Sequence, residues 1–177
     1  MNHIMLGLET LGTLPSSIVV SIGATRFDPN TGTSSGRFYA VLDRIEQRVA
    51  KRTEDNETLA WWAQQEPEAR RVFIENQEPV ADALCRLTRF IGPDVKGVWG
   101  NGASFDNVIL ASLYRTFDLK VPWPHTADRC FRTLKAIGKA NDVKPPPFLG
   151  VPHNALDDAL HQAAHLQRIV LAANVRI

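Results

Sequence analysis

Apolar and polar residues alternate near the start of the chain with the two-residue period of a β-strand. Residues 4–9 show this pattern, which places Gly7 and Glu9 on one side and three aliphatic side chains on the other. Residues 18–27 and 37–42 are rich in strand-forming side chains and are separated by a loop of Asp, Pro, Asn and Gly. The pattern predicts a three-stranded antiparallel meander.

Helical periodicity follows in the middle of the chain. It extends over residues 56–75, where Pro67 should divide the helix in two, and over residues 80–90. Residues 98–100 indicate a short buried strand, which leads through a polar turn into a helix over residues 104–118. The strand, the turn and the helix together predict one edge of a functional site.

The last third of the chain predicts two more helices. They cover residues 127–139 and 155–173, with a proline-rich loop over residues 145–150 between them. No internal repeat or linker interrupts the pattern, and 177 residues suit one domain with a sizeable core. We therefore predict a single domain over residues 1–177.

Composition excludes several classes of protein. The hydrophobic content of 44% and charged content of 22% are typical of a globular chain and not of a disordered one. With a net charge of +1, any contact with nucleic acid must come from local basic patches. Cys85 and Cys130 lie too far apart for a zinc knuckle, and neither a signal peptide nor a membrane-spanning stretch is evident. The sequence predicts a cytoplasmic protein without a membrane partner.

Asp106 stands out because it shares a helical face with apolar residues. Leu110, Leu113 and Phe117 follow it at the spacing of a buried stripe. A buried carboxylate without a partner costs several kcal/mol, so its surroundings should contain a cation or several hydrogen-bond donors. A divalent metal would meet that need. The alternative is that Asp106 caps the helix near its N-terminus.

Other candidate groups lie near the ends of predicted elements. Glu9 ends the first strand, where the alternative is a solvated glutamate. Asn154 suits the N-cap of the last helix, and Asp157, three residues later, would complete the cap and so have a structural role. Asp158 is then the candidate metal ligand, and the alternative is a second acid favoured at the helix N-terminus. His153 precedes this helix on a loop, where an imidazole can reach a substrate.

In combination, these residues carry a resemblance to a known family. The three motifs are Gly7-Leu8-Glu9-Thr10, Asn101-Gly102-Ala103-Ser104-Phe105-Asp106 and His153-Asn154-Ala155-Leu156-Asp157-Asp158-Ala159. They resemble those of the histidine-bearing branch of the DEDD 3′-to-5′ exonucleases, often called DEDDh. The segment Thr58-Leu59-Ala60-Trp61-Trp62 is similar to the small phage and bacterial exonuclease and exoribonuclease subgroup.

The resemblance implies a ribonuclease-H-like α/β fold, with a mixed sheet and helices on both faces. It implies that Glu9, Asp106 and Asp158 hold two divalent ions, Mg²⁺ or Mn²⁺, and that Glu9 and His153 are catalytic. Two such metals can activate a water and neutralise the leaving oxygen of a phosphodiester. An imidazole titrates near neutral pH, which suits His153 as the general base. The expected reaction is hydrolysis of single-stranded or short DNA or RNA from its 3′ end to nucleoside 5′-monophosphates.

The same resemblance places a set of residues against the terminal nucleotide. These are Thr10, Leu11, Gly12, Trp61, Asn101 and Phe105. Trp61 or Trp62 would supply a stacking surface, although core packing is the better interpretation for at least one of them. Arg129, Arg132, Lys135 and Lys139 are predicted to share one helical face, which would either track a phosphate backbone or simply be solvated.

Gly7 departs from the motif, because the family has an aspartate there that bridges both metals. A glycine inside a strand is unfavourable, and local folding gives no evident reason for it. We therefore expect impaired activity in this chain. The alternatives are a catalytically silent nucleic-acid-binding protein on the same fold and an α/β interaction module without a metal. Relatives often self-associate, so a homodimer is among the partners considered.

Overall fold

A five-stranded mixed sheet forms the centre of the computed structural model, which describes all 177 residues. The strands are β1 (His3–Thr10), β2 (Val19–Phe27), β3 (Ser34–Val41), β4 (Gly97–Gly100) and β5 (Asp128–Cys130), in the order β3-β2-β1-β4-β5. The first three are antiparallel neighbours, which confirms the predicted meander. β4 and β5 run parallel to β1 and extend the sheet at its other edge.

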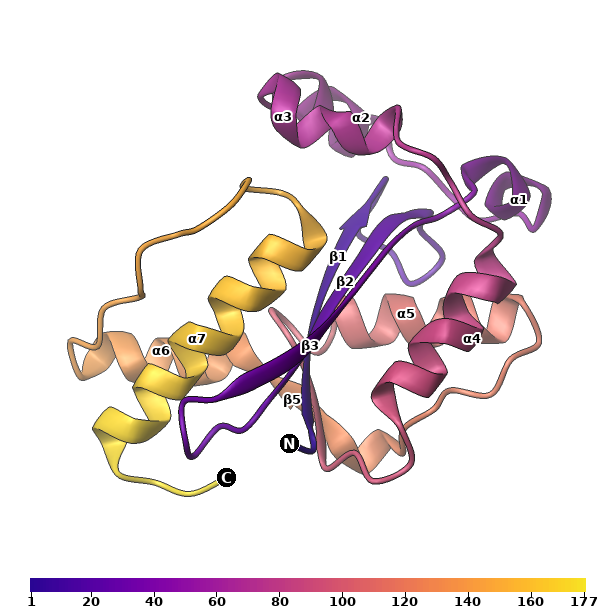
Figure 1. The fold of residues 1–177 in the computed structure, drawn as a ribbon. Coiled ribbons are helices and arrows are strands. Elements are labelled where there is room, and N and C mark those ends of the chain that lie inside the picture. The colour runs from indigo at the N-terminus through magenta and orange to yellow at the C-terminus, as the bar shows by residue number, and fades with distance from the viewer.

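Helices cover both faces of this sheet, as Figure 1 shows: α6 and α7 lie on one face and α4 and α5 on the other. The helices are α1 (Arg44–Val49), α2 (Asn56–Ala63), α3 (Pro67–Arg70), α4 (Val80–Ile91), α5 (Asp106–Thr116), α6 (Phe131–Ala140) and α7 (Ala155–Ala173), with 3₁₀ turns η1 (Arg71–Phe73) and η2 (His125–Ala127). Pro67 begins α3 after a break, as predicted. The predicted mixed sheet with helices on both faces is confirmed. No helix has the combination of length and apolar character that crossing a bilayer requires.

Two differences from the predicted elements have physical reasons. Residues 127–130 were expected to be helical, but they form the end of η2 and β5, because Asp128 and its two successors pair with β4. The helix α1 was not predicted, since its six residues show little periodicity. It is nucleated by Asp43, whose Oδ1 accepts from the amides of Ile45 at 2.7 Å and Glu46 at 3.0 Å.

The alternation in β1 separates two cores. Ile4, Leu6 and Leu8 belong to the larger core with α4 and α5, while Met5 belongs to a second core with α7. All eight residues of β1 are buried. The two-residue pattern therefore distinguishes two buried faces, and Glu9 and Gly7 lie on the face that α7 covers.

Gly7 and Gly23 are cross-strand partners beneath the first turn of α7. A Cβ atom at Gly7 would lie 2.3 Å from the carbonyl oxygen of Ala155, and one at Gly23 would lie 2.1 Å from the carbonyl carbon of Ala155. These contacts are with backbone, which cannot rotate away. The expectation that folding gives no reason for Gly7 is therefore wrong, because the glycine pair lets α7 lie directly on the sheet.

Arg52 ties the loop after β1 to α5. Its side chain is buried, and it donates to the carbonyl oxygens of Ser17 at 2.6 Å and Pro15 at 3.1 Å and to Thr116 Oγ1 at 3.0 Å. Burial lowers the pKa of this guanidinium to about 10. Arg52 thus fixes the loop that continues from Glu9 and Thr10.

Replacing Arg52 with methionine is expected to lower the free energy of unfolding by about 2–4 kcal/mol, because buried carbonyls lose their donors. The matched control is Arg48→Met, which removes only a half-exposed ion pair with Glu54 and should cost under about 1 kcal/mol. Urea denaturation of the three proteins measures both values. Equal losses for the two variants would contradict a specific structural role of Arg52.

Candidate active site

A cavity of about 680 Å³ opens where β1 ends and where α2, α5 and α7 begin. Glu9, Asp106, His153 and Asp158 all line it. These four residues come from three motifs that are about 50 to 100 positions apart in the chain. The structure therefore brings the four candidate catalytic or metal-ligating residues to one site.

Glu9 is buried at the end of β1, with 8% of its surface exposed. The register of β1 against β2 shifts between Glu9 and Thr10, so the strand ends at an irregularity. Burial raises the pKa of Glu9 well above its usual value, and the charges of Asp158 and Asp106 raise it further. The alternative of a solvated strand-end glutamate is therefore wrong.

Asp106 is the first residue of α5 and is only 4% exposed. The cap position is held by Phe105, and Asp106 Oδ2 has no hydrogen-bond partner, so the capping alternative is not observed. Burial raises the pKa of Asp106 to about 7, against the lowering effect of nearby backbone amides and Arg132. Such an uncompensated carboxylate oxygen suits a cation.

Asp158 enters the cavity from the first turn of α7. Asn154 is the N-cap, and its Oδ1 accepts from the amides of Leu156 at 3.0 Å and Asp157 at 3.2 Å, as predicted. Asp157 has a structural role, because its Oδ2 accepts from the amide of Val151 at 2.8 Å. Burial raises the pKa of Asp158, while His153 opposes the shift. Asp158 is therefore the acid of this motif that faces the site.

His153 lies on the loop before α7 with a φ of +64°, in the left-handed region. Its ring meets Trp61 edge-on at a centroid distance of 4.9 Å. Trp61 is 41% exposed and lines the cavity, whereas Trp62 is buried and donates from Nε1 to the carbonyl oxygen of Thr10 at 2.9 Å. Trp62 is thus a core residue, and Trp61 presents an exposed aromatic surface to the cavity.

The residues predicted to contact the substrate divide into two groups. Thr10, Gly12, Trp61, Asn101 and Phe105 line the cavity. Leu11 does not line it: its side chain is 2% exposed and packs in a third core with Ile18 and Val20. The turn of the chain after β1 directs this aliphatic side chain inward.

Several other residues line the cavity although no motif indicated a role for them in the site, namely Thr13, Asp55, Glu57, Thr58 and Gln162. Asp55 caps α2, with Oδ2 accepting from Thr58 Oγ1 at 2.6 Å. An Asp three residues before a Thr at the start of a predicted helix is a pattern that would have indicated this cap. Gln162 follows Asp158 by four residues on α7, and this one-turn spacing would have indicated that both side chains face the cavity.

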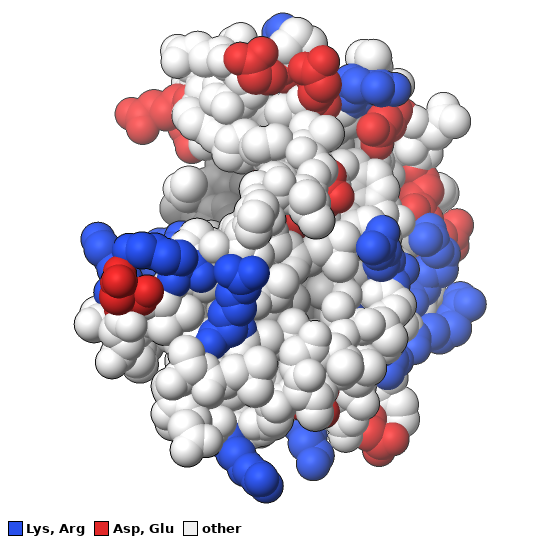
Figure 2. Space-filling view, turned by 60° about the vertical axis from the view of Figure 1, so that its left-hand side comes forward, with Lys and Arg blue, Asp and Glu red and all other residues white.

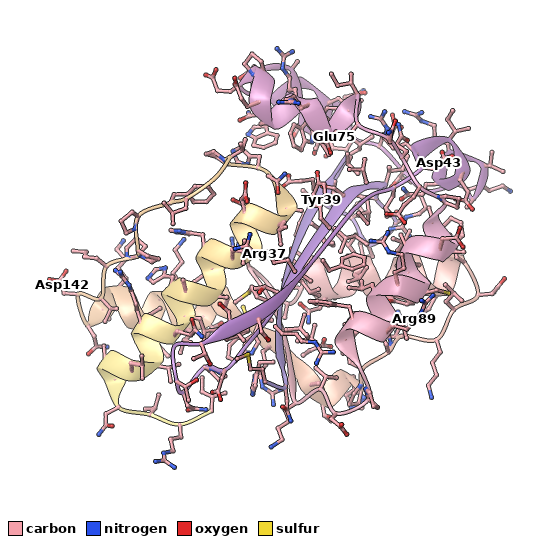
Figure 3. All side chains as sticks on the ribbon, in the orientation of Figure 1. Arg37, Tyr39, Asp43, Glu75, Arg89 and Asp142 are labelled. Atoms are coloured by element: carbon pink, nitrogen blue, oxygen red, sulfur yellow. The ribbon has the colours of Figure 1, made fainter.

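Tyr39 and Glu75 hold the segment after η1 against β3, and Figure 3 shows their side chains pointing toward one another. The Tyr39 hydroxyl donates to Glu75 Oε2 at 3.1 Å. Burial raises the pKa of Tyr39, and the charge of Glu75 adds to the effect. This contact anchors the segment that follows α2 and α3 to the sheet beside the site.

The donors of the site fit a hard divalent cation. Glu9, Asp106 and Asp158 supply carboxylate oxygens, which Mg²⁺ and Mn²⁺ prefer. Two observations support the fit: the unpartnered Oδ2 of Asp106 and the raised pKa of Glu9. No three His, Cys, Asp or Glu side chains are close enough together in the structure to hold one ion. The acids converge on one cavity without forming a complete ligand cage.

Solved structures share this fold along nearly the whole chain. The nuclease domain of 3′hExo, described as a DEDDh family member bound to rAMP, matches 99% of this chain and 94% of its own, with a TM-score of 0.62 and 13% identity. Exonuclease X in complex with 5′ overhanging duplex DNA matches 97% and 93%, with a TM-score of 0.58 and 16% identity. Cell-death related nuclease 4 matches 95% and 63%, with a TM-score of 0.63 and 14% identity. These matches confirm the ribonuclease-H-like fold.

One relative and one family model match the sequence. The exodeoxyribonuclease of Enterobacteria phage T4 is 26% identical over 124 residues, which are 63% of this chain and 55% of that protein. The match thus spans little more than half the length of the relative. The profile described as the 3′-5′ exoribonuclease Rv2179c-like domain matches residues 2–170. The chain therefore belongs to the family described as the 3′-5′ exoribonuclease Rv2179c-like domain.

Proposed function

We propose that this chain hydrolyses single-stranded or short DNA or RNA from the 3′ end and releases nucleoside 5′-monophosphates. Glu9, Asp106 and Asp158 would hold divalent Mg²⁺ or Mn²⁺, and His153 would act as general base. The single observation that carries the proposal is the convergence of these four side chains on one cavity. Burial of the carboxylates supports it, because buried acids with raised pKa values cluster at functional sites.

His153 and Trp61 would have different roles in the hydrolysis. His153 takes the proton of the attacking water, the water oxygen bonds to phosphorus, and the bond from phosphorus to the 3′ oxygen of the preceding nucleotide breaks. Trp61 offers its exposed face to the terminal base, which contributes on the order of 1–3 kcal/mol without sequence preference. Divalent metal, when bound, supplies Lewis acidity that neutralises developing charge on the phosphate oxygens.

Gly7 is proposed to weaken this chemistry. A carboxylate at this place in the motif would be a second strand-borne oxygen donor beside Glu9, and glycine supplies none. The remaining acids number three, and the second of two metals would lose a ligand. Reduced turnover, rather than a different reaction, is the expected consequence.

The test is digestion of end-labelled single-stranded DNA and RNA with magnesium, manganese or EDTA. We expect stepwise shortening from the 3′ end that EDTA abolishes. Asp158→Asn and His153→Ala should each lower turnover by about 10²–10⁴-fold. The matched control is Asp157→Asn, the same change one residue earlier, where an amide oxygen still accepts from Val151. A control that loses as much activity as Asp158→Asn would refute the assignment.

A second candidate is a catalytically silent nucleic-acid-binding protein. It is favoured by the close packing of α7 on β1, because a Cβ atom added at Gly7 would lie 2.3 Å from the carbonyl oxygen of Ala155. Metal-dependent binding of an oligonucleotide without any product, even with manganese, would establish this candidate in place of the first.

A further inference from the structure

A second cleft adjoins the catalytic cavity. It has a volume of about 750 Å³ and lies between α6, the loop that follows it and α7. Asn101, Arg132, Asp158 and Gln162 line both spaces, so they form a shared wall. A chain end held beside Asp158 can therefore continue into the cleft without crossing the protein surface.

Positive charge dominates the wall of this cleft. Arg132, Lys135 and Lys139 project from α6 at successive positions of one face, and Lys144 follows on the loop. Lys144 is paired with Asp142, but the three cations of α6 form no ion pair or hydrogen bond. Figure 2 shows Lys and Arg side chains gathered beside the hollow on this side of the molecule.

Buried polar atoms without partners form the opposite wall. His165 lines the cleft on α7, is only 5% exposed, and has no hydrogen-bond partner at Nε2. Nδ1 of His161 and Oε1 of Gln162 are likewise buried and unpartnered. Buried polar groups in folded proteins normally have partners. The two histidine nitrogens can donate to a phosphate oxygen when they carry the proton, whereas the amide oxygen of Gln162 needs a donor such as a sugar hydroxyl. The three atoms together indicate a polar ligand that has both phosphate and hydroxyl groups.

The dimensions suit a strand of phosphates. From Arg132 to Lys139 is seven residues, or roughly 10 Å along the helix axis. Successive phosphates of a stacked strand are about 3.4 Å apart along its axis. The cationic face is thus about three phosphate steps long, and its three cations can contact two or three phosphates. Arg129, which was predicted to share this face, lies in β5 instead and donates to backbone carbonyls there.

We infer that the α6–α7 cleft binds the two or three phosphates on the 5′ side of the nucleotide being removed. This inference rests on the proposed function, and it gives the enzyme a preference for chains longer than a dinucleotide. Arg132 stands at the junction of the two spaces, and Lys135 and Lys139 contact only the upstream strand.

The experiment compares the Lys135→Gln/Lys139→Gln double variant with a control of equal charge change, Lys51→Gln/Lys120→Gln, whose residues line neither space. KM is measured for a dinucleotide and an octanucleotide. The ratio of the octanucleotide KM to the dinucleotide KM should rise about tenfold in the cleft variant only. Thermal melting verifies that both proteins are folded.

A binding assay separates this inference from the activity itself. Fluorescence anisotropy with the labelled octanucleotide in EDTA should show weaker binding by the cleft variant. The slope of log affinity against log salt should fall by roughly 1.4 in magnitude, the value for two single-strand phosphate contacts. Weakened binding with no hydrolysis by any form would support the cleft while the nuclease assignment fails. Active enzyme with unchanged octanucleotide binding and KM ratio would overturn the cleft and leave the nuclease assignment intact.

Discussion

Gly7→Asp is expected to raise turnover on single-stranded substrate by about 100-fold, which corresponds to roughly 2.7 kcal/mol of transition-state stabilisation. The added carboxylate would stand two residues from Glu9 on the same side of β1 and would complete the ligands of the second metal. Steady-state kinetics of both proteins with magnesium and manganese measure the gain. Indistinguishable turnover would show that position 7 does not limit the reaction.

The higher turnover of Gly7→Asp is expected to come with a loss of stability, which requires a separate control variant. The new Cβ would meet the carbonyl oxygen of Ala155 at 2.3 Å, so the first turn of α7 must retreat. Gly7→Ala imposes the same contact without a carboxylate. It is expected to lose about 1–3 kcal/mol of stability and to gain no turnover. A rise in activity in Gly7→Ala would assign the effect to movement of α7 instead of metal ligation.

The metal-free protein is expected to lose stability as pH rises from about 4 to about 7. Asp106 has an ordinary pKa of 3.8 and a folded pKa of about 7, raised chiefly by burial. The folded state therefore binds more protons in this window, and its advantage is lost as the carboxyl ionises. The loss attributable to Asp106 is roughly 2–4 kcal/mol. Manganese, which favours the ionised acids, should restore stability at pH 8.

Urea denaturation in EDTA at several pH values measures this effect, with Asp106→Asn as the control. Burial lowers the pKa values of His3, His161 and His165, and these groups act oppositely, because their contribution is lost as pH falls. The informative quantity is consequently the difference between the two proteins. A difference that stays constant from pH 4 to pH 8 would contradict the raised pKa of Asp106.

Local patterns were enough to predict most of the elements and to indicate Asp106 as a buried acid. The alternation in β1, the cap at Asn154 and the apolar stripe after Asp106 all depend on neighbours in sequence. The motifs added what the residues alone left open, namely that Glu9, Asp106 and Asp158 belong together. Each of these signals is contained in a segment of about ten residues.

The features that escaped prediction depend on distant partners. β5 has three residues and exists because Asp128 to Cys130 pair with β4. The burial of Leu11 depends on Ile18 and Val20, which the turn after β1 brings back. The structural reason for a glycine at position 7 is its close packing against Ala155, almost 150 positions away in the sequence. Sequence spacing carries no record of such contacts.

The glycine pair under α7 also sets the depth of the catalytic cavity. His153 lies just before this helix and Asp158 lies in its first turn. The distance of both residues from the sheet is therefore set by the close packing of α7 on the backbone of Gly7 and Gly23. Any atom added at either position lifts the imidazole and the acid together, relative to Glu9. Substitutions at positions 7 and 23 would therefore change the distance between His153 and Glu9 by moving the first turn of α7.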